Sequence, residues 1–145
     1  MKAYVAFYKA FEASGSIMSD KAIALWTRGK YSHCELVVDG YMYSSSPRDG
    51  GVRRKVHAYN LNTWEYIEVD IDVKELYGFY GHTKDCKYDW LGILGFIFNN
   101  RDDPDKYFCS EWVATVLSFS KYRLSKIPSK LSPNGLFKEL KGVIC

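Results

Sequence analysis

The sequence lacks any apolar run long enough to cross a bilayer. Its longest apolar stretch, Trp90 to Phe98, falls far short of the roughly 20 residues that a transmembrane helix needs, and we expect it to lie in a buried helix. Residues 1–9 alternate like a strand and have neither the apolar core nor the small-residue cleavage site of a signal peptide. A cytoplasmic protein with no transmembrane segment is therefore predicted.

An excess of one charge is also absent. The 20 lysine and arginine residues are nearly balanced by 17 aspartate and glutamate residues, and the net charge of +3 is dispersed along the chain. This balance argues against a nucleic-acid partner. The densest basic cluster, Arg53, Arg54 and Lys55, is interpreted as the solvated face of a strand.

Cysteine pairs of the Cys-x-x-Cys kind are missing, so neither a zinc ribbon nor a dense disulfide framework is indicated. The four cysteines, which should be free thiols in a reducing compartment, are Cys34, Cys86, Cys109 and Cys145. A metal site built on His33, Cys34 and another thiol is disfavoured because adjacent strand residues point to opposite faces. No metal and no cofactor is expected.

What is present fits one domain, residues 1–145, large enough to enclose a core with a polar site at its edge. The sequence pattern predicts strands over 2–8, 31–38, 41–45, 52–57 and 67–72, with Asp39-Gly40 as a hairpin turn. It predicts helices from Ser19 or Asp20 toward Gly29, over 73–81, 85–98 and 109–118, and from Pro133 onward. An antiparallel sheet packed against helices makes the fold class α+β.

The helix predicted over 109–118 begins at Cys109, whose side chain shares an inward face with Val113. At a helix N-terminus, the dipole and the unpaired backbone N–H groups lower the pKa of a thiol, and the same groups can hold a developing oxyanion. Cys109 is thus a candidate nucleophile. The alternative is a buried cysteine that only packs beside Val113.

His33 lies on a predicted strand and is a candidate partner for this thiol. A neutral imidazole can take the thiol proton and later return it to a leaving group, although a lone strand histidine is more often a core or surface residue. The Asp39-Gly40 turn sets a register in which Glu35 faces Ser44 and His33 faces Ser46.

Three segments carry a family resemblance: Tyr31-Ser-His-Cys-Glu-Leu36, Asp49-Gly-Gly-Val52 and, above all, Phe108-Cys-Ser-Glu-Trp-Val113. They are similar to the motifs of circularly permuted NlpC-type papain-like hydrolases, a group that includes YiiX- and YaeF-like amidases and, more remotely, lecithin retinol acyltransferase-like enzymes. In the papain order cysteine precedes histidine, whereas in the permuted group histidine comes first, as here. The resemblance extends loosely over nearly the whole chain.

The resemblance implies a permuted papain-like fold in which Cys109 is the nucleophile and His33 the general base. Its third catalytic position falls at Ser44, where the group commonly has histidine or glutamate. Glu35 is the other candidate to orient the imidazole, directly or through the serine, since it lies two residues along the same strand face; the alternative is that Glu35 is an exposed strand residue. Glu111 is expected to have a structural role in the first helical turn.

The expected function is that of a thiol hydrolase, an amidase, peptidase or acyl-ester hydrolase that forms an acyl-enzyme. Its substrate would be a peptide, a peptidoglycan fragment or a lipid acyl group, and such a chain would suit a phage or bacterial accessory protein. The alternative is a catalytically inactive module that binds a peptide or lipid in the same cleft, because Ser44 is a weak third residue.

Overall fold

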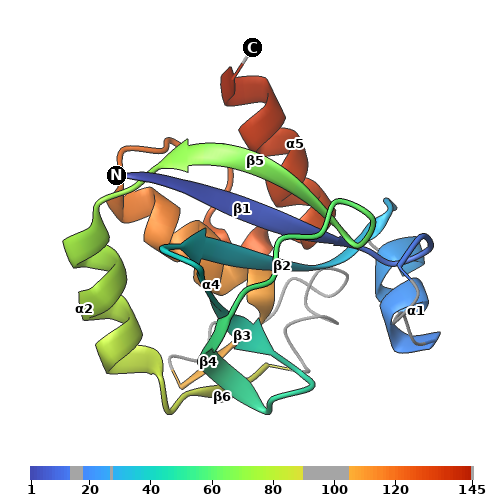
Figure 1. Ribbon diagram of the computed structural model, residues 1–145, viewed down its shortest axis with the longest axis horizontal. Coiled ribbons are helices and arrows are strands. Elements are labelled where there is room, and N and C mark those ends of the chain that lie inside the picture. Colours follow the sequence, from blue (N-terminus) through green and yellow to red (C-terminus); the bar gives the residue numbers. More distant parts are fainter. Residues whose placement is uncertain (14–17, 27, 90–104, 145) are drawn as a thin grey trace.

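The computed structural model describes residues 1–13, 18–26, 28–89 and 105–144 (Figure 1). In these ranges the strands form one seven-stranded sheet in the order β5-β1-β2-β3-β4-β6-β7. The strands are Lys2–Lys9 (β1), Tyr31–Val38 (β2), Tyr41–Ser46 (β3), Gly51–Val56 (β4), Trp64–Asp70 (β5), Lys87–Tyr88 (β6) and Lys106–Tyr107 (β7). Neighbouring strands are antiparallel except β6 and β7, which are parallel. The predicted α+β class is confirmed.

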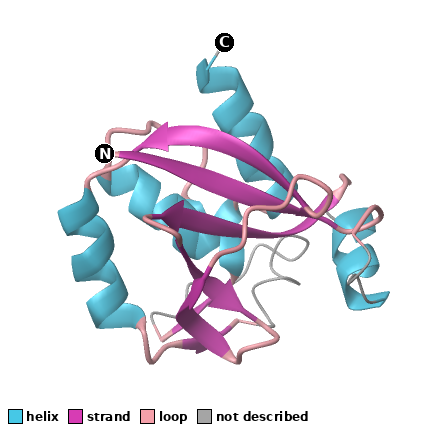
Figure 2. Cartoon of the chain, in the orientation of Figure 1, coloured by secondary structure: helices cyan, strands magenta, loops and turns pink. Residues whose placement is uncertain are grey.

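Helices α4 and α5 pass behind the sheet, with α2 and α1 at its two ends (Figure 2). The helices are Met18–Trp26 (α1), Val73–Thr83 (α2), Cys109–Phe119 (α4) and Pro133–Ile144 (α5), with a short 3-10 helix at Pro128–Lys130. None of the helices in the described ranges has the length and hydropathy of a bilayer-spanning segment.

The apolar core lies between the sheet and α4. Trp112, Val113 and Leu117 of α4 are fully buried in the same cluster as Phe7 of β1 and Leu36 of β2. Side chains alternate along a strand, and His33 is three residues from the core residue Leu36. The His33 side chain therefore lies on the other face of the sheet.

Several element boundaries differ from the sequence prediction by a few residues, and two of the differences have a clear physical cause. The strand predicted to reach Asp72 ends at Asp70, because the Asp72 side chain accepts a hydrogen bond from the Lys74 N–H at 2.9 Å and caps α2. The helix predicted from Asp85 is wrong at its start, where Lys87 and Tyr88 form β6. Their backbones pair with β4 and β7 instead, and residues 90–98 of that predicted helix lie outside the described residues.

Candidate active site

The ladder between β2 and β3 opens next to His33. It pairs Leu36–Val38 with Tyr41–Tyr43, and in the described register it does not continue to Cys34, although β3 runs on to Ser46 beside β4. Backbone groups of β2 beyond this point therefore need other partners. The N-terminal end of α4 supplies one of them, since α4 packs against both strands.

Cys109 is the first residue of α4 and is 2% exposed. Hydrogen bonds made by the two neighbouring residues, Phe108 and Ser110, hold the first turn of the helix in place. The Phe108 N–H donates to the Glu111 carboxylate at 3.4 Å, and the Ser110 hydroxyl donates to the Leu131 carbonyl at 2.6 Å. Glu111 thus closes the first turn of the helix, and these contacts hold the sulfur in one place.

The Cys109 sulfur lies at the edge of β2. It is hydrogen-bonded to the His33 imidazole and to both the thiol and the backbone N–H of Cys34. His33 and Cys34 point to opposite faces of the strand, so a sulfur that contacts both must sit beside the strand, within the opening of the ladder. Residues 76 positions apart in sequence meet here.

The same opening explains the position of Ser44. Its hydroxyl donates to the Cys34 carbonyl at 2.8 Å, so the carbonyl and the N–H of Cys34 are satisfied by Ser44 and Cys109 in place of ladder partners. Ser44 is fully buried, and its hydroxyl is directed to the backbone rather than to the imidazole.

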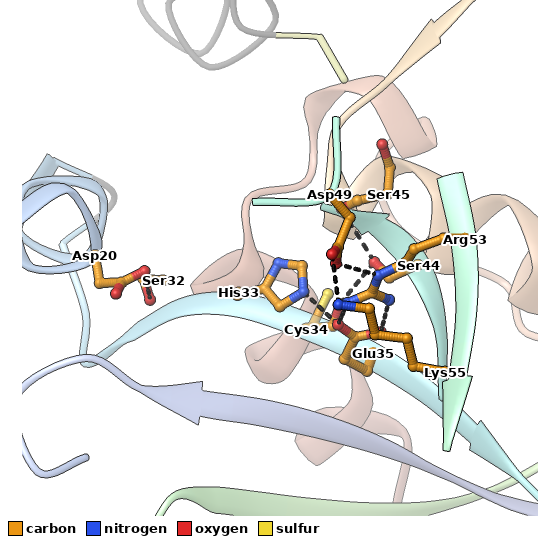
Figure 3. Close-up of polar contacts among 10 residues, drawn as sticks. All are labelled: Asp20, Ser32, His33, Cys34, Glu35, Ser44, Ser45, Asp49, Arg53 and Lys55. Atoms are coloured by element: carbon orange, nitrogen blue, oxygen red, sulfur yellow. Dashed lines mark hydrogen bonds and ion pairs between the residues drawn. The ribbon is translucent and has the colours of Figure 1, made fainter. Parts of the chain in front are cut away.

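Glu35 is the group that contacts His33. Its Oε1 lies 2.5 Å from His33 Nε2, and the side chain is 1% exposed. Arg53 of β4 donates to both carboxylate oxygens at 2.6 Å, and its Nε donates to Asp49 at 2.8 Å. Lys55 also pairs with Asp49. Figure 3 shows these charges alternating outward from the imidazole.

These contacts set the protonation states. Burial alone raises the pKa of the Cys109 thiol, but the hydrogen bonds from Cys34 and the charge of His33 outweigh it and bring the pKa well below its ordinary value. Burial lowers the pKa of His33, yet Cys109 and Glu35 reverse the shift and raise it to about 10.

The pKa of the Glu35 carboxyl group is also set by burial and by neighbouring charges. Burial raises the pKa of Glu35, whereas His33 and Arg53 lower it, and the net result is a pKa below the ordinary value. At neutral pH the site therefore holds a thiolate, an imidazolium and an ionised carboxylate in contact.

The structure thus brings Cys109, His33 and Glu35 together and leaves Ser44 bonded to the strand backbone. The interpretation of Arg53 as a solvated residue is wrong: its side chain is 16% exposed and ion-paired with Glu35. Arg54 and Lys55 are exposed, as that interpretation required. One feature of the sequence could have indicated the role of Arg53. In the β3–β4 hairpin Arg53 lies opposite Ser44, the residue that the predicted hairpin register places opposite Glu35.

A cavity of about 390 Å³ lies on the His33 side of the sheet, a size typical of small-ligand pockets. His33, Glu35 and Arg53 line it together with the rings of Tyr8 and Trp64. The Trp64 ring centroid is 6.4 Å from that of the His33 imidazole. Within the described ranges no group of three or more histidine, cysteine, aspartate or glutamate residues is arranged to hold a metal ion.

No protein-family model matches the chain, and the comparisons with curated proteins and with solved structures likewise give no match.

Proposed function

We propose that this protein is a cysteine hydrolase of the circularly permuted papain-like type, which cleaves an amide or ester through an acyl-enzyme. The observation that carries the proposal is the contact between the Cys109 sulfur, at the N-terminus of α4, and the His33 imidazole, which is itself bound to buried Glu35. A nucleophile, a base and a group that orients the base are the parts that covalent acyl transfer requires.

The chemistry follows from the protonation states. The Cys109 thiolate attacks the substrate carbonyl carbon, and the carbonyl electron pair moves to oxygen, where N–H groups at the α4 N-terminus can stabilise it. The oxyanion then collapses and expels an amine or alcohol, which takes the proton from His33. In the second half, His33 removes a proton from water, and the water oxygen bonds to the thioester carbon. The C–S bond then breaks, which releases the acid product and restores the Cys109 thiolate beside the protonated His33.

Glu35 has the role of keeping the imidazole oriented and of stabilising its positive charge. Its Oε1 contacts one ring nitrogen, which leaves the other ring nitrogen for the sulfur. We therefore assign the third position to Glu35 and give Ser44 the role of satisfying the Cys34 carbonyl.

Two further features support the papain-like assignment. Histidine precedes cysteine in the chain, as in the permuted group that the sequence resembles, and the nucleophile heads a helix packed on an antiparallel sheet. The cavity beside His33 would receive part of the substrate, with the Tyr8 and Trp64 rings against its apolar portion. A peptide, a peptidoglycan fragment and a lipid acyl group all remain substrate candidates.

One observation favours the alternative of an inactive module that binds a peptide or lipid. Cys109 is only 2% exposed, so a substrate carbonyl must displace covering groups before it reaches the sulfur. Covalent labelling separates the two functions, because an inactive binder forms no acyl-enzyme.

The test uses p-nitrophenyl acetate and p-nitrophenyl octanoate, with intact-mass spectrometry and peptide mapping. We expect a single acyl adduct on Cys109 that turns over, that is lost in Cys109→Ala, and that falls at least about a hundredfold in rate in His33→Ala. Cys86→Ala, which removes another described free thiol, is the control and should leave the rate unchanged. Slow, equal acylation of several cysteines without turnover would contradict the proposal.

A further inference from the structure

Arg53 reaches Glu35 across an intervening strand. Ser44 is directly opposite Arg53 in the β3–β4 register, and continuing the β2–β3 register by one residue places Glu35 opposite Ser44. The three residues therefore lie in a row across β2, β3 and β4 on one face of the sheet. Figure 3 shows the Arg53 guanidinium extended over Ser44 to the Glu35 carboxylate.

The small side chain of Ser44 makes this reach possible. Arg53 and Glu35 lie on strands with β3 between them, and their contacts at 2.6 Å show that the two extended side chains together span the width of β3. A long side chain at the middle position would occupy that space. Ser44 fills little of it and turns its hydroxyl to the Cys34 carbonyl.

The two contacts that Arg53 makes fix both the charge and the orientation of Glu35. A carboxylate that is 1% exposed would take up a proton if it had no cation beside it, because burial disfavours the charged form. The guanidinium fork binds Oε1 and Oε2 at 2.6 Å each, which holds the carboxylate plane and keeps Oε1 directed at His33. Asp49 holds the guanidinium from the other side.

We propose that Arg53 is a positioning residue of the active site, which acts on His33 through Glu35 and so maintains Cys109 as a thiolate. The inference rests on the proposed function and adds to it a fourth residue, outside the three segments that carry the family resemblance. It predicts that the reactivity of Cys109 depends on a side chain two strands away.

The experiment measures the rate of Cys109 alkylation by iodoacetamide as a function of pH, with peptide mapping to assign the site. In Arg53→Met, Glu35 becomes neutral, the imidazolium loses its counter-charge, and the midpoint of the Cys109 profile moves up. We expect a shift of at least one pH unit, equal to about a tenfold lower rate at pH 6. Guanidinium added at millimolar concentration to Arg53→Ala should restore part of the rate.

Three comparisons show whether Arg53 acts through Glu35. Arg54→Met removes the exposed arginine next along β4 and should leave the profile unchanged. In a Glu35→Gln background, Arg53→Met should produce no further shift. Arg53→Lys keeps the cation but not the fork, so it should shift the profile less than Arg53→Met and serves as the test where the methionine variant does not fold.

The outcomes separate this inference from the proposed function. Wild-type Cys109 that is no more reactive than the other thiols at pH 6 would contradict the proposed function itself. Reactive wild-type Cys109 together with an unshifted profile in folded Arg53→Met, or in Arg53→Lys where the methionine variant does not fold, would overturn the role of Arg53 alone. An equal shift in Arg54→Met would also overturn it.

Discussion

Replacing Glu35 with glutamine should destabilise the protein strongly, although the two side chains have nearly the same shape. Glu35 is 1% exposed, accepts two hydrogen bonds at 2.6 Å from Arg53, and lies 2.5 Å from His33. The substitution removes the negative charge from between two cations and leaves a buried guanidinium with Asp49 as its remaining carboxylate.

The magnitude follows from these contacts. Breaking a buried ion pair by removing one partner costs about 3–5 kcal/mol, and since Arg53 keeps Asp49 we expect the lower end, about 3 kcal/mol. With a urea m-value of about 2 kcal/mol/M, the unfolding midpoint at pH 7 should fall by about 1.5 M.

The pH dependence supplies a second check. The pKa of Glu35 is lowered in the folded state from its ordinary value of 4.5, so its stabilisation is complete above that value and is lost as the pH falls through the lowered one. The difference between wild type and Glu35→Gln should shrink at acid pH. The control is Glu68→Gln, which removes a half-exposed carboxylate of β5 that pairs with Lys2 of β1. It should cost less than about 0.5 kcal/mol. A midpoint change in Glu35→Gln no larger than that of the control would show that the buried carboxylate does not stabilise the fold.

Three further substitutions test the surroundings of the site. Cys34→Ala removes a thiol hydrogen bond to Cys109 and should move the alkylation midpoint of Cys109 to higher pH, whereas an unchanged midpoint would show that the contact is unimportant. Thr83→Val removes the acceptor, at 2.9 Å, of the indole N–H of buried Trp112; unfolding in urea should show a loss of about 1–3 kcal/mol, and a neutral result would argue against this bond. Asp72→Ala removes the α2 cap and should cost about 1 kcal/mol in thermal unfolding, with no change in Cys109 reactivity.

Local pattern was sufficient for much of the fold. Strand-favouring residues followed by the Asp39-Gly40 turn mark β2 over Tyr31–Val38, and Pro133 marks the start of α5. The helix beginning at Cys109 follows from its apolar periodicity. In each case the deciding interactions are between residues close in sequence, which is why the sequence alone reveals them.

Contacts made across the sheet were not accessible in the same way. The short β6 exists because Lys87 pairs with Gly51 and Lys106, and neither partner is near it in sequence. The ion pair of Arg53 with Glu35 depends on two strand registers and on the small size of Ser44 between them. Without those registers, the basic run Arg53-Arg54-Lys55 is interpreted as the solvent-exposed face of a strand, since charged side chains are mostly exposed.

If Cys109 and His33 form a thiolate–imidazolium pair, the absorbance of the thiolate near 240 nm, measured as a function of pH, will show it. We predict that wild type retains the absorbance of one thiolate at pH 6, that Cys109→Ala lacks it, and that His33→Ala gains it only near the ordinary cysteine pKa of about 8.5. A wild-type titration identical to that of His33→Ala, with no thiolate below pH of about 8, would mean that the pair does not form.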